Sequence, residues 1–155
     1  MLKTLTKVAA TAALLTAPFA AWADAHQEMT IRAVANSNEN DEDYDGLVVF
    51  KNYVEAASNG RIGVELFIGT QLCSGGAECL EGVAEGSIDV YITTSGGAAG
   101  IMPFVQVLDL PYLMSDDRVA EAVLTGDFTR TMRDMGLEAT DGALRLMTIG
   151  NTGGW

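Results

Sequence analysis

The stretch LEGVAEGSIDVYITTSGGAAGIMPFVQVLDLPYL, residues 80–113, decides the fold class of this chain. A short helical segment ends at Gly86, because glycine adopts the left-handed backbone of a helix C-terminus without a steric clash. An apolar strand is predicted to follow from Ile88 to Ile92, and a rim of hydroxyl side chains comes after it (Thr93, Thr94 and Ser95). Hydroxyls at the carboxyl end of a buried strand face the crevice in which open α/β sheets bind ligands. The stretch therefore predicts a buried strand with a ligand-binding edge.

Strands and helices alternate along the rest of the chain. An amphipathic helix over 47–57 is indicated by apolar residues that recur on one helical face (Leu47, Phe50, Val54 and Ala57). Period-two alternation predicts a strand over 62–68. Further strands are expected over 29–35, 87–93 and 143–149. This order predicts an α/β lobe with a parallel or mixed sheet and helices on both of its faces.

The other helices are expected from their boundary residues. One runs over 77–85, one begins after a cap at Ser115, and one runs over 128–135 and ends at Gly136. The polar segment before residue 46 and the glycine-rich run at 96–100 are expected to be connections, the second of them flexible.

Residues 1–23 have the pattern of a secretory signal peptide. A basic start is followed by an apolar run over 8–21 and by a small-x-small cleavage site that ends at Ala23, with an almost equally good alternative at Ala25. The apolar run is short for a bilayer span, although a membrane anchor or a buried N-terminal helix is the alternative interpretation. We therefore expect a protein that is exported to the periplasm.

The acidic charge of the chain excludes several classes of partner. Its formal net charge is −12 at pH 7. Loss of Lys3 and Lys7 with the signal peptide leaves 7 basic against 21 acidic residues, a formal charge of −14. Nucleic acids and anionic lipids require clustered Lys and Arg, so neither is an expected partner. A ligand carboxylate would depend on local hydrogen-bond donors.

No catalytic residue, metal site or cofactor is predicted. The single histidine, His26, falls in the N-terminal tail of the mature chain, so a nucleophile–histidine set is not expected. The run DEDYDG at 41–46 matches the first half of an EF-hand calcium loop, but the twelfth position is Asn52 rather than glutamate. An acidic helix N-terminus is the favoured interpretation, with calcium as the alternative. The run at 96–100 lacks the spacing of a nucleotide-binding loop.

Cys73 and Cys79 are the two cysteines of the chain, and they enclose a short segment rich in glycine. In an oxidising compartment so close a pair favours an intramolecular disulfide. The spacing differs from the C-x-x-C of redox enzymes, and two cysteines with one distant histidine cannot complete a zinc tetrahedron. The sequence therefore predicts a structural disulfide.

Several motifs occur in an order that resembles the solute-binding subunits of TRAP transporters, the DctP-like family. The motifs are a strand that ends at Asn36, a helix with Phe50 and Val54, GRIGVELF at 60–67, TQL at 70–72, EGSIDV at 85–90 and LDLPYL at 108–113. The resemblance implies two α/β lobes that close on a small organic acid, which is a dicarboxylate, keto acid or sugar acid. It also implies delivery of that acid to a sodium-driven membrane permease, and no enzymatic activity.

The resemblance further implies which residues contact the ligand. They are Asn36, Thr93 and Thr94 in the first lobe, and Asn151 and Trp155 at the crossover to the second lobe. Amides and hydroxyls suit ligand oxygens, and an aromatic face suits an apolar part. Capping of the strand end is the structural alternative for each threonine.

The same resemblance implies a domain organisation. Residues 24–150 are expected to form the N-terminal lobe and residues 151–155 to begin the crossover. The second lobe, with the arginine that pairs with the substrate carboxylate in this family, is expected to lie beyond Trp155. Cys73 and Cys79 depart from the common pattern of the family.

Two other classes of protein stay open on the sequence. The first is a binding protein of an ABC importer or of a membrane sensor. The second is a secreted α/β enzyme, which the lack of a nucleophile–base set disfavours.

Overall fold

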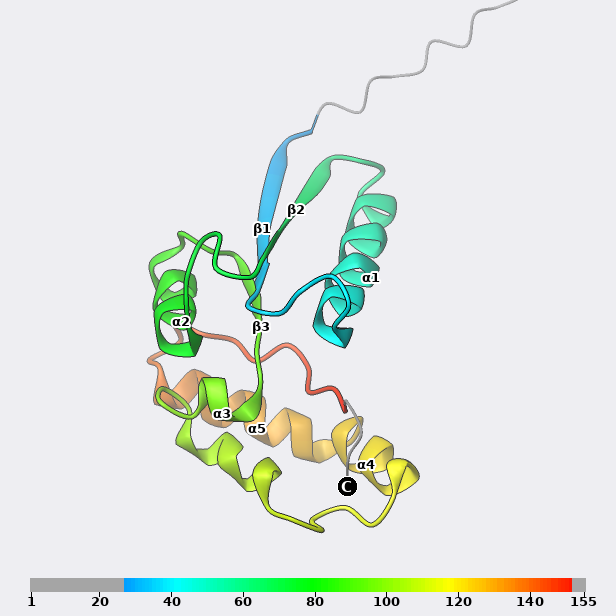
Figure 1. Ribbon diagram of the computed structural model, residues 1–155, viewed down its shortest axis with the longest axis vertical. Helices are drawn as coiled ribbons and strands as arrows, with labels where there is room; N and C mark the ends of the chain where they lie inside the picture. The colour runs from blue at the N-terminus through cyan, green and yellow to red at the C-terminus, as the bar shows by residue number, and fades with distance from the viewer. Residues whose placement is uncertain (1–26, 152–155) are drawn as a thin grey trace, which may run out of the picture.

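The computed structural model describes residues 27–151, so the predicted signal peptide, His26 and Trp155 lie outside the described residues. Three parallel strands form one sheet in the order β2-β1-β3 (Figure 1). The strands are β1 at Met29–Ala35, β2 at Ile62–Ile68 and β3 at Val90–Ile92. β1 pairs with β2 along its whole length and with β3 through its last three residues. The bounds of β1 and β2 are those that the sequence predicts.

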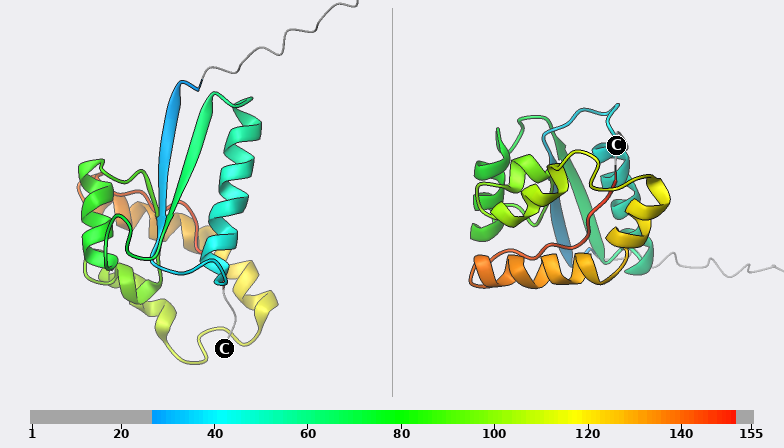
Figure 2. Two further views of the ribbon diagram at one scale, coloured as in Figure 1. Left: turned by 45° about the horizontal axis from the view of Figure 1, so that its top comes forward. Right: turned by 90° about the horizontal axis from the view of Figure 1, so that it is seen from below.

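Each face of the sheet is covered by a helix, because alternate residues of β1 point to opposite sides. Ala33 and Ala35 pack with Leu47 of α1 (Glu42–Ala57) on one face. Val34 packs with Cys79 of α2 (Gly76–Glu85) on the other face. Figure 2 shows the two helices on opposite sides of the strands. The α/β lobe with a parallel sheet and helices on both faces is therefore confirmed.

α1 begins at Glu42, earlier than the apolar pattern predicts. Its first turn holds Glu42, Asp43 and Asp45, and acidic side chains there are stabilised by the helix dipole. The run at 41–46 is therefore a helix N-terminus and not the loop of an EF-hand. Within residues 27–151, no group of three or more His, Cys, Asp or Glu side chains is placed to hold a metal ion.

β3 is shorter than the strand predicted over 87–93. The amides of Ser87 and Ile88 both donate to the carbonyl of Gly82, at 2.9 and 3.0 Å, and so complete the end of α2. The amide of Asp89 donates to the carbonyl of Arg32 at 3.0 Å, while the Asp89 carboxylate accepts from the Arg32 amide and Nε at 2.8 and 3.0 Å. Before Val90, the backbone amides of Ser87 and Ile88 therefore complete the end of α2, and Asp89 pairs with Arg32, so the regular strand begins only at Val90.

Short helices lie beyond the carboxyl ends of the strands, in the lower part of Figure 1. They are α3 (Ser95–Ala98), the 3-10 helix η1 (Pro103–Asp109), α4 (Asp117–Leu124) and α5 (Asp127–Ala139). The glycine-rich run is partly helical rather than a flexible connection, because the Thr94 hydroxyl accepts from the Gly97 amide at 3.1 Å and caps α3. α4 is capped by Asp116, whose carboxylate accepts from two amides at 3.0 and 3.1 Å, and not by Ser115 as predicted.

Two predictions for the C-terminal segment are wrong. α5 continues through Gly136, where a Cβ would lie 3.3 Å from the sulfur of Met102, so this glycine permits close packing instead of ending the helix. No strand forms over 143–149 within the described chain. Arg133 of α5 donates to the carbonyls of Leu146 and Met147 at 3.0 and 2.8 Å. A side chain therefore occupies acceptors that a neighbouring strand would need.

Among the helices of residues 27–151, none has the length and apolar character that a bilayer span requires.

Candidate ligand-binding pocket

The carboxyl ends of β1 and β3 meet at one edge of the sheet, where a pocket of about 390 Å³ opens. Asn36 and Ser37 line it after β1, and Thr93 and Thr94 line it after β3. The first turn of α1 contributes Asp43. The structure thus brings three of the predicted contact residues, Asn36, Thr93 and Thr94, to one site.

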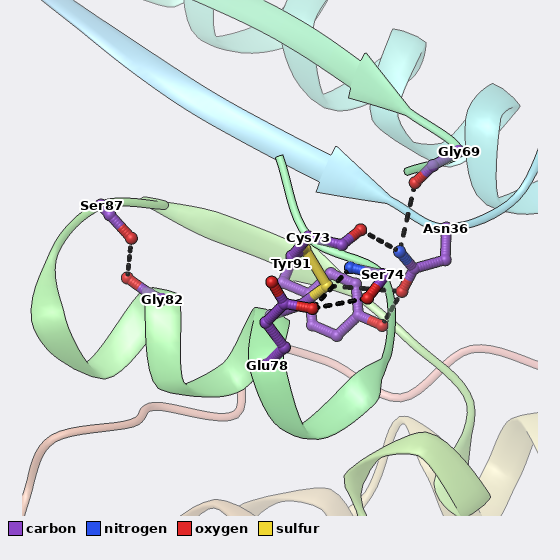
Figure 3. The surroundings of a disulfide bond; sticks show 9 residues. Asn36, Gly69, Cys73, Ser74, Glu78, Gly82, Ser87 and Tyr91 are labelled. Carbon is purple, nitrogen blue, oxygen red and sulfur yellow. Dashed lines mark hydrogen bonds between the residues drawn. A yellow bond between two sulfur atoms is a disulfide. The ribbon is translucent and has the colours of Figure 1, made fainter. Parts of the chain in front are cut away.

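Asn36 joins three parts of the pocket wall (Figure 3). Its amide nitrogen donates to the carbonyls of Gly69 and Cys73, at 3.2 and 3.0 Å. Its amide oxygen accepts from the hydroxyl of Tyr91 in β3. A primary amide has two hydrogens and its oxygen has two lone pairs. Asn36 can therefore accept a further hydrogen bond from a ligand, but both of its own hydrogens are engaged.

The predicted disulfide between Cys73 and Cys79 is present, and the sulfur of Cys79 lies 3.4 Å from the amide oxygen of Asn36. Both cysteines are buried. The loop that they close is held further by Glu78, whose carboxylate accepts from the hydroxyl and the amide of Ser74 at 2.6 and 3.0 Å (Figure 3). These two hydrogen bonds lower the pKa of Glu78. The bridge thus fixes the loop that supplies Ser74 to the pocket.

In the pocket wall, the backbones of α2 and α3 approach each other closely at Gly76 and Gly97. A Cβ on Gly76 would overlap the carbonyl oxygen of Gly97, and a Cβ on Gly97 would overlap the hydroxyl of Thr93. Thr94 caps the N-terminus of α3, which differs from the strand-end capping considered as its structural alternative. Its hydroxyl oxygen accepts from the Gly97 amide, which leaves the hydroxyl hydrogen for a ligand.

Asn151, which the resemblance implies as a contact, does not line this pocket. It lines a larger groove of about 1750 Å³, which shares five residues with the pocket, Asp43 among them, and is also lined by Arg145. Its amide nitrogen donates to the carboxylate of Asp117 at 3.3 Å. The fifth predicted contact, Trp155, lies outside the described residues.

Ser37 and Asp43 are pocket residues that the sequence does not predict. The Ser37 hydroxyl is buried and has no hydrogen-bond partner within residues 27–151. Burial raises the pKa of Asp43, and the carboxylates of Asp41 and Glu42 raise it further. No Lys or Arg of the described chain lines the pocket. The site is therefore rich in hydrogen-bond acceptors and poor in positive charge.

Comparison with known proteins adds a family match. The sequence model of bacterial extracellular solute-binding protein, family 7, matches residues 33–153. A curated relative from Verminephrobacter eiseniae, described as a solute-binding protein, is 29% identical over 104 residues. The match covers 67% of this chain and 31% of the relative.

Two solved structures of TRAP periplasmic solute-binding proteins share the fold. The one from Sulfurospirillum deleyianum, with bound succinate, has a TM-score of 0.65 and 23% identity over 72% of this chain and 36% of its own. The one from Roseobacter denitrificans, with bound L-galactonate, has a TM-score of 0.66 and 24% identity over 74% of this chain and 37% of its own. This chain thus spans about a third of the length of these proteins. The matched family and structures are solute-binding proteins rather than enzymes.

Proposed function

Because this chain belongs to the family of bacterial extracellular solute-binding proteins, family 7, we propose that it forms the first lobe of a receptor for a small organic acid. The receptor reaches the periplasm through the signal peptide at 1–23. There it closes two lobes on the acid and delivers it to the membrane permease of a sodium-driven TRAP transporter. The related structures with bound succinate and L-galactonate support an organic acid as the ligand class.

The observation that carries this proposal is the pocket at the carboxyl edge of the parallel sheet. Open α/β sheets bind ligands at this edge, and Asn36, Thr93 and Thr94 meet there. In the proposed complex these residues hydrogen-bond one end of the ligand, while Asn151 and Trp155 complete the site at the crossover.

This lobe alone is expected to bind weakly. Neutral hydrogen bonds contribute about 0.5–1.5 kcal/mol net each. A ligand carboxylate is held firmly by charge-assisted, bidentate pairing with arginine, and no Lys or Arg of the described residues lines the pocket. In the proposal the second lobe supplies that cation, and its closure removes the ligand from water.

Calorimetry of two proteins tests the proposal. Residues 24–155 and the gene product in full are titrated with C4-dicarboxylates, keto acids and sugar acids. We expect affinities of about 1 mM or weaker for residues 24–155, and of about 1 μM or tighter for the full product with one of the acids, a difference of about 4 kcal/mol. Tight binding by residues 24–155 would refute the two-lobe argument. If the full gene product bound none of these acids, the organic-acid assignment would be refuted.

Sodium coupling is tested separately. Uptake of the bound acid is measured in proteoliposomes that contain the permease, with and without a sodium gradient. Equal rates in the two conditions would contradict this part of the proposal.

A further inference from the structure

Several neutral polar groups of the pocket are already engaged within the protein. Both amide hydrogens of Asn36 are used, and the Tyr91 hydroxyl donates to its amide oxygen. The Ser74 hydroxyl donates to Glu78. Only a few side chains of the pocket therefore remain free to form hydrogen bonds with a ligand.

The charged acceptor that stays available in the pocket is Asp43. Within residues 27–151 the Asp43 carboxylate accepts no hydrogen bond and forms no ion pair. The amide oxygen of Asn36 keeps one lone pair for a ligand. The buried hydroxyl of Ser37 has no partner in the described chain, and such a group is costly until something bonds to it. Because the hydroxyls of Ser37 and Thr94 can still donate, a ligand group that both donates and accepts, such as a hydroxyl, suits this pocket.

On the premise of the proposed function, we infer that the pocket takes the hydroxyl-bearing end of a polyhydroxylated monocarboxylate, such as an aldonate or a uronate. Asp43 is the acceptor that selects this ligand over a dicarboxylate.

The charges around Asp43 give the reason for this selection. A second carboxylate in the pocket would face Asp43, with Asp41 and Glu42 close by. Arg145 lines only the larger adjoining groove, and no Lys or Arg of the described residues lines the pocket itself, so like charges within the pocket would repel each other in a partly desolvated site. A ligand hydroxyl instead donates to the carboxylate in a charge-assisted hydrogen bond.

The two related structures illustrate the two ligand shapes. Succinate carries a carboxylate at each end. If the proposed cation of the second lobe binds one of them, the other has to enter the pocket of the first lobe. L-Galactonate carries a carboxylate at one end and hydroxyls along its other carbons. Each was found bound to a TRAP periplasmic solute-binding protein. The choice between them therefore depends on local residues, and here Asp43 and Ser37 favour the hydroxylated end.

The inference is tested by calorimetry on the full gene product. L-Galactonate and a panel of aldonates and uronates are compared with succinate. We expect at least one hydroxylated acid to bind about tenfold or more tighter than succinate. Asp43→Asn should weaken that binding about tenfold and narrow the preference over succinate, because the charge-assisted bond and the repulsion are lost together. Asp45→Asn is the matched control: it removes the same charge from the same helical turn, outside the pocket, and should leave both affinities unchanged.

Ser37→Ala provides a second measurement that does not depend on Asp43. The hydroxyl has no partner in the described chain, so its removal should leave the melting temperature unchanged or higher while affinity for the hydroxylated acid falls. A loss of stability without a loss of affinity would overturn the role of Ser37. Succinate bound as tightly as every hydroxylated acid, or an unchanged preference in Asp43→Asn, would overturn the inference and leave the proposed function intact. Failure of the whole panel to bind would overturn the proposed function itself.

Discussion

Reduction of the Cys73–Cys79 disulfide is expected to lower the stability of the fold and to loosen the loop that forms part of the pocket wall. The bridge closes a loop with a sequence separation of 6. For so short a loop the chain-entropy model assigns about 2–2.5 kcal/mol of stabilisation, which arises from the restricted unfolded chain. The carbonyl of Cys73 also accepts from Asn36, and the loop supplies Ser74 to the pocket wall. Greater mobility of this loop would therefore disturb the wall of the candidate pocket.

Urea denaturation of the oxidised and the reduced protein measures the effect. We expect the free energy of unfolding to fall by about 2 kcal/mol on reduction. The double variant Cys73→Ala, Cys79→Ala is the control, because a reductant should leave its stability unchanged. Mass spectrometry after alkylation without a reductant should show both cysteines protected in exported protein.

Two results would refute this reasoning. A difference below about 0.5 kcal/mol between oxidised and reduced protein would show that loop closure does not stabilise this fold as the chain-entropy model requires. Two freely alkylated cysteines in exported protein would show that the bridge does not form in the cell.

Two further predictions concern stability. Gly76→Ala should cost about 1–3 kcal/mol, because its Cβ would overlap the backbone of Gly97, whereas Gly75→Ala, which meets nothing within 4 Å, is the control; equal urea midpoints for the two variants would contradict the close contact. Hydrogen bonds from Arg32 lower the pKa of Asp89, so their stabilisation is present above the ordinary Asp value of about 4 and is lost as the pH falls below it. Asp89→Asn should therefore lower the melting temperature near pH 6, and its difference from the wild type should shrink towards pH 3; a difference that stays constant over this range would refute the linkage.

Sequence patterns predicted the fold wherever burial alone determines the structure. β1 and β2 have the predicted bounds, because their apolar residues are packed between the helices that cover the two faces of the sheet. Prediction failed where a side chain takes over a backbone role. Residues 143–149 have an apolar pattern, but Arg133 occupies two of their carbonyls. Ser115 and Asp116 are both good capping residues, so composition could not choose between them.

The same distinction explains the candidate site. Thr93 and Thr94 could be placed because residues after a buried strand lie at the binding edge of the sheet, whereas Asn36 was implied by the family resemblance. Asp43 could not be placed, because it reaches the pocket only through the early start of α1 and its packing on the sheet. Ser37 follows Asn36 directly, yet neither its burial nor its missing partner can be read from the sequence.

The contact between Gly76 and Gly97 restricts how such a pocket can diversify in evolution. Gly76 accepts no side chain unless α2 and α3 move apart, and a Cβ on Gly97 would overlap the Thr93 hydroxyl, so substitutions at either position disturb the scaffold before they change ligand preference. Tyr91 is tied to Asn36, which constrains that position as well. If the pocket binds a ligand as proposed, a change of ligand preference is expected at positions such as Ser37 and Asp43, while the backbone wall stays the same. After a gene duplication, substitutions at these two positions could change the ligand preference of one copy without changing its fold.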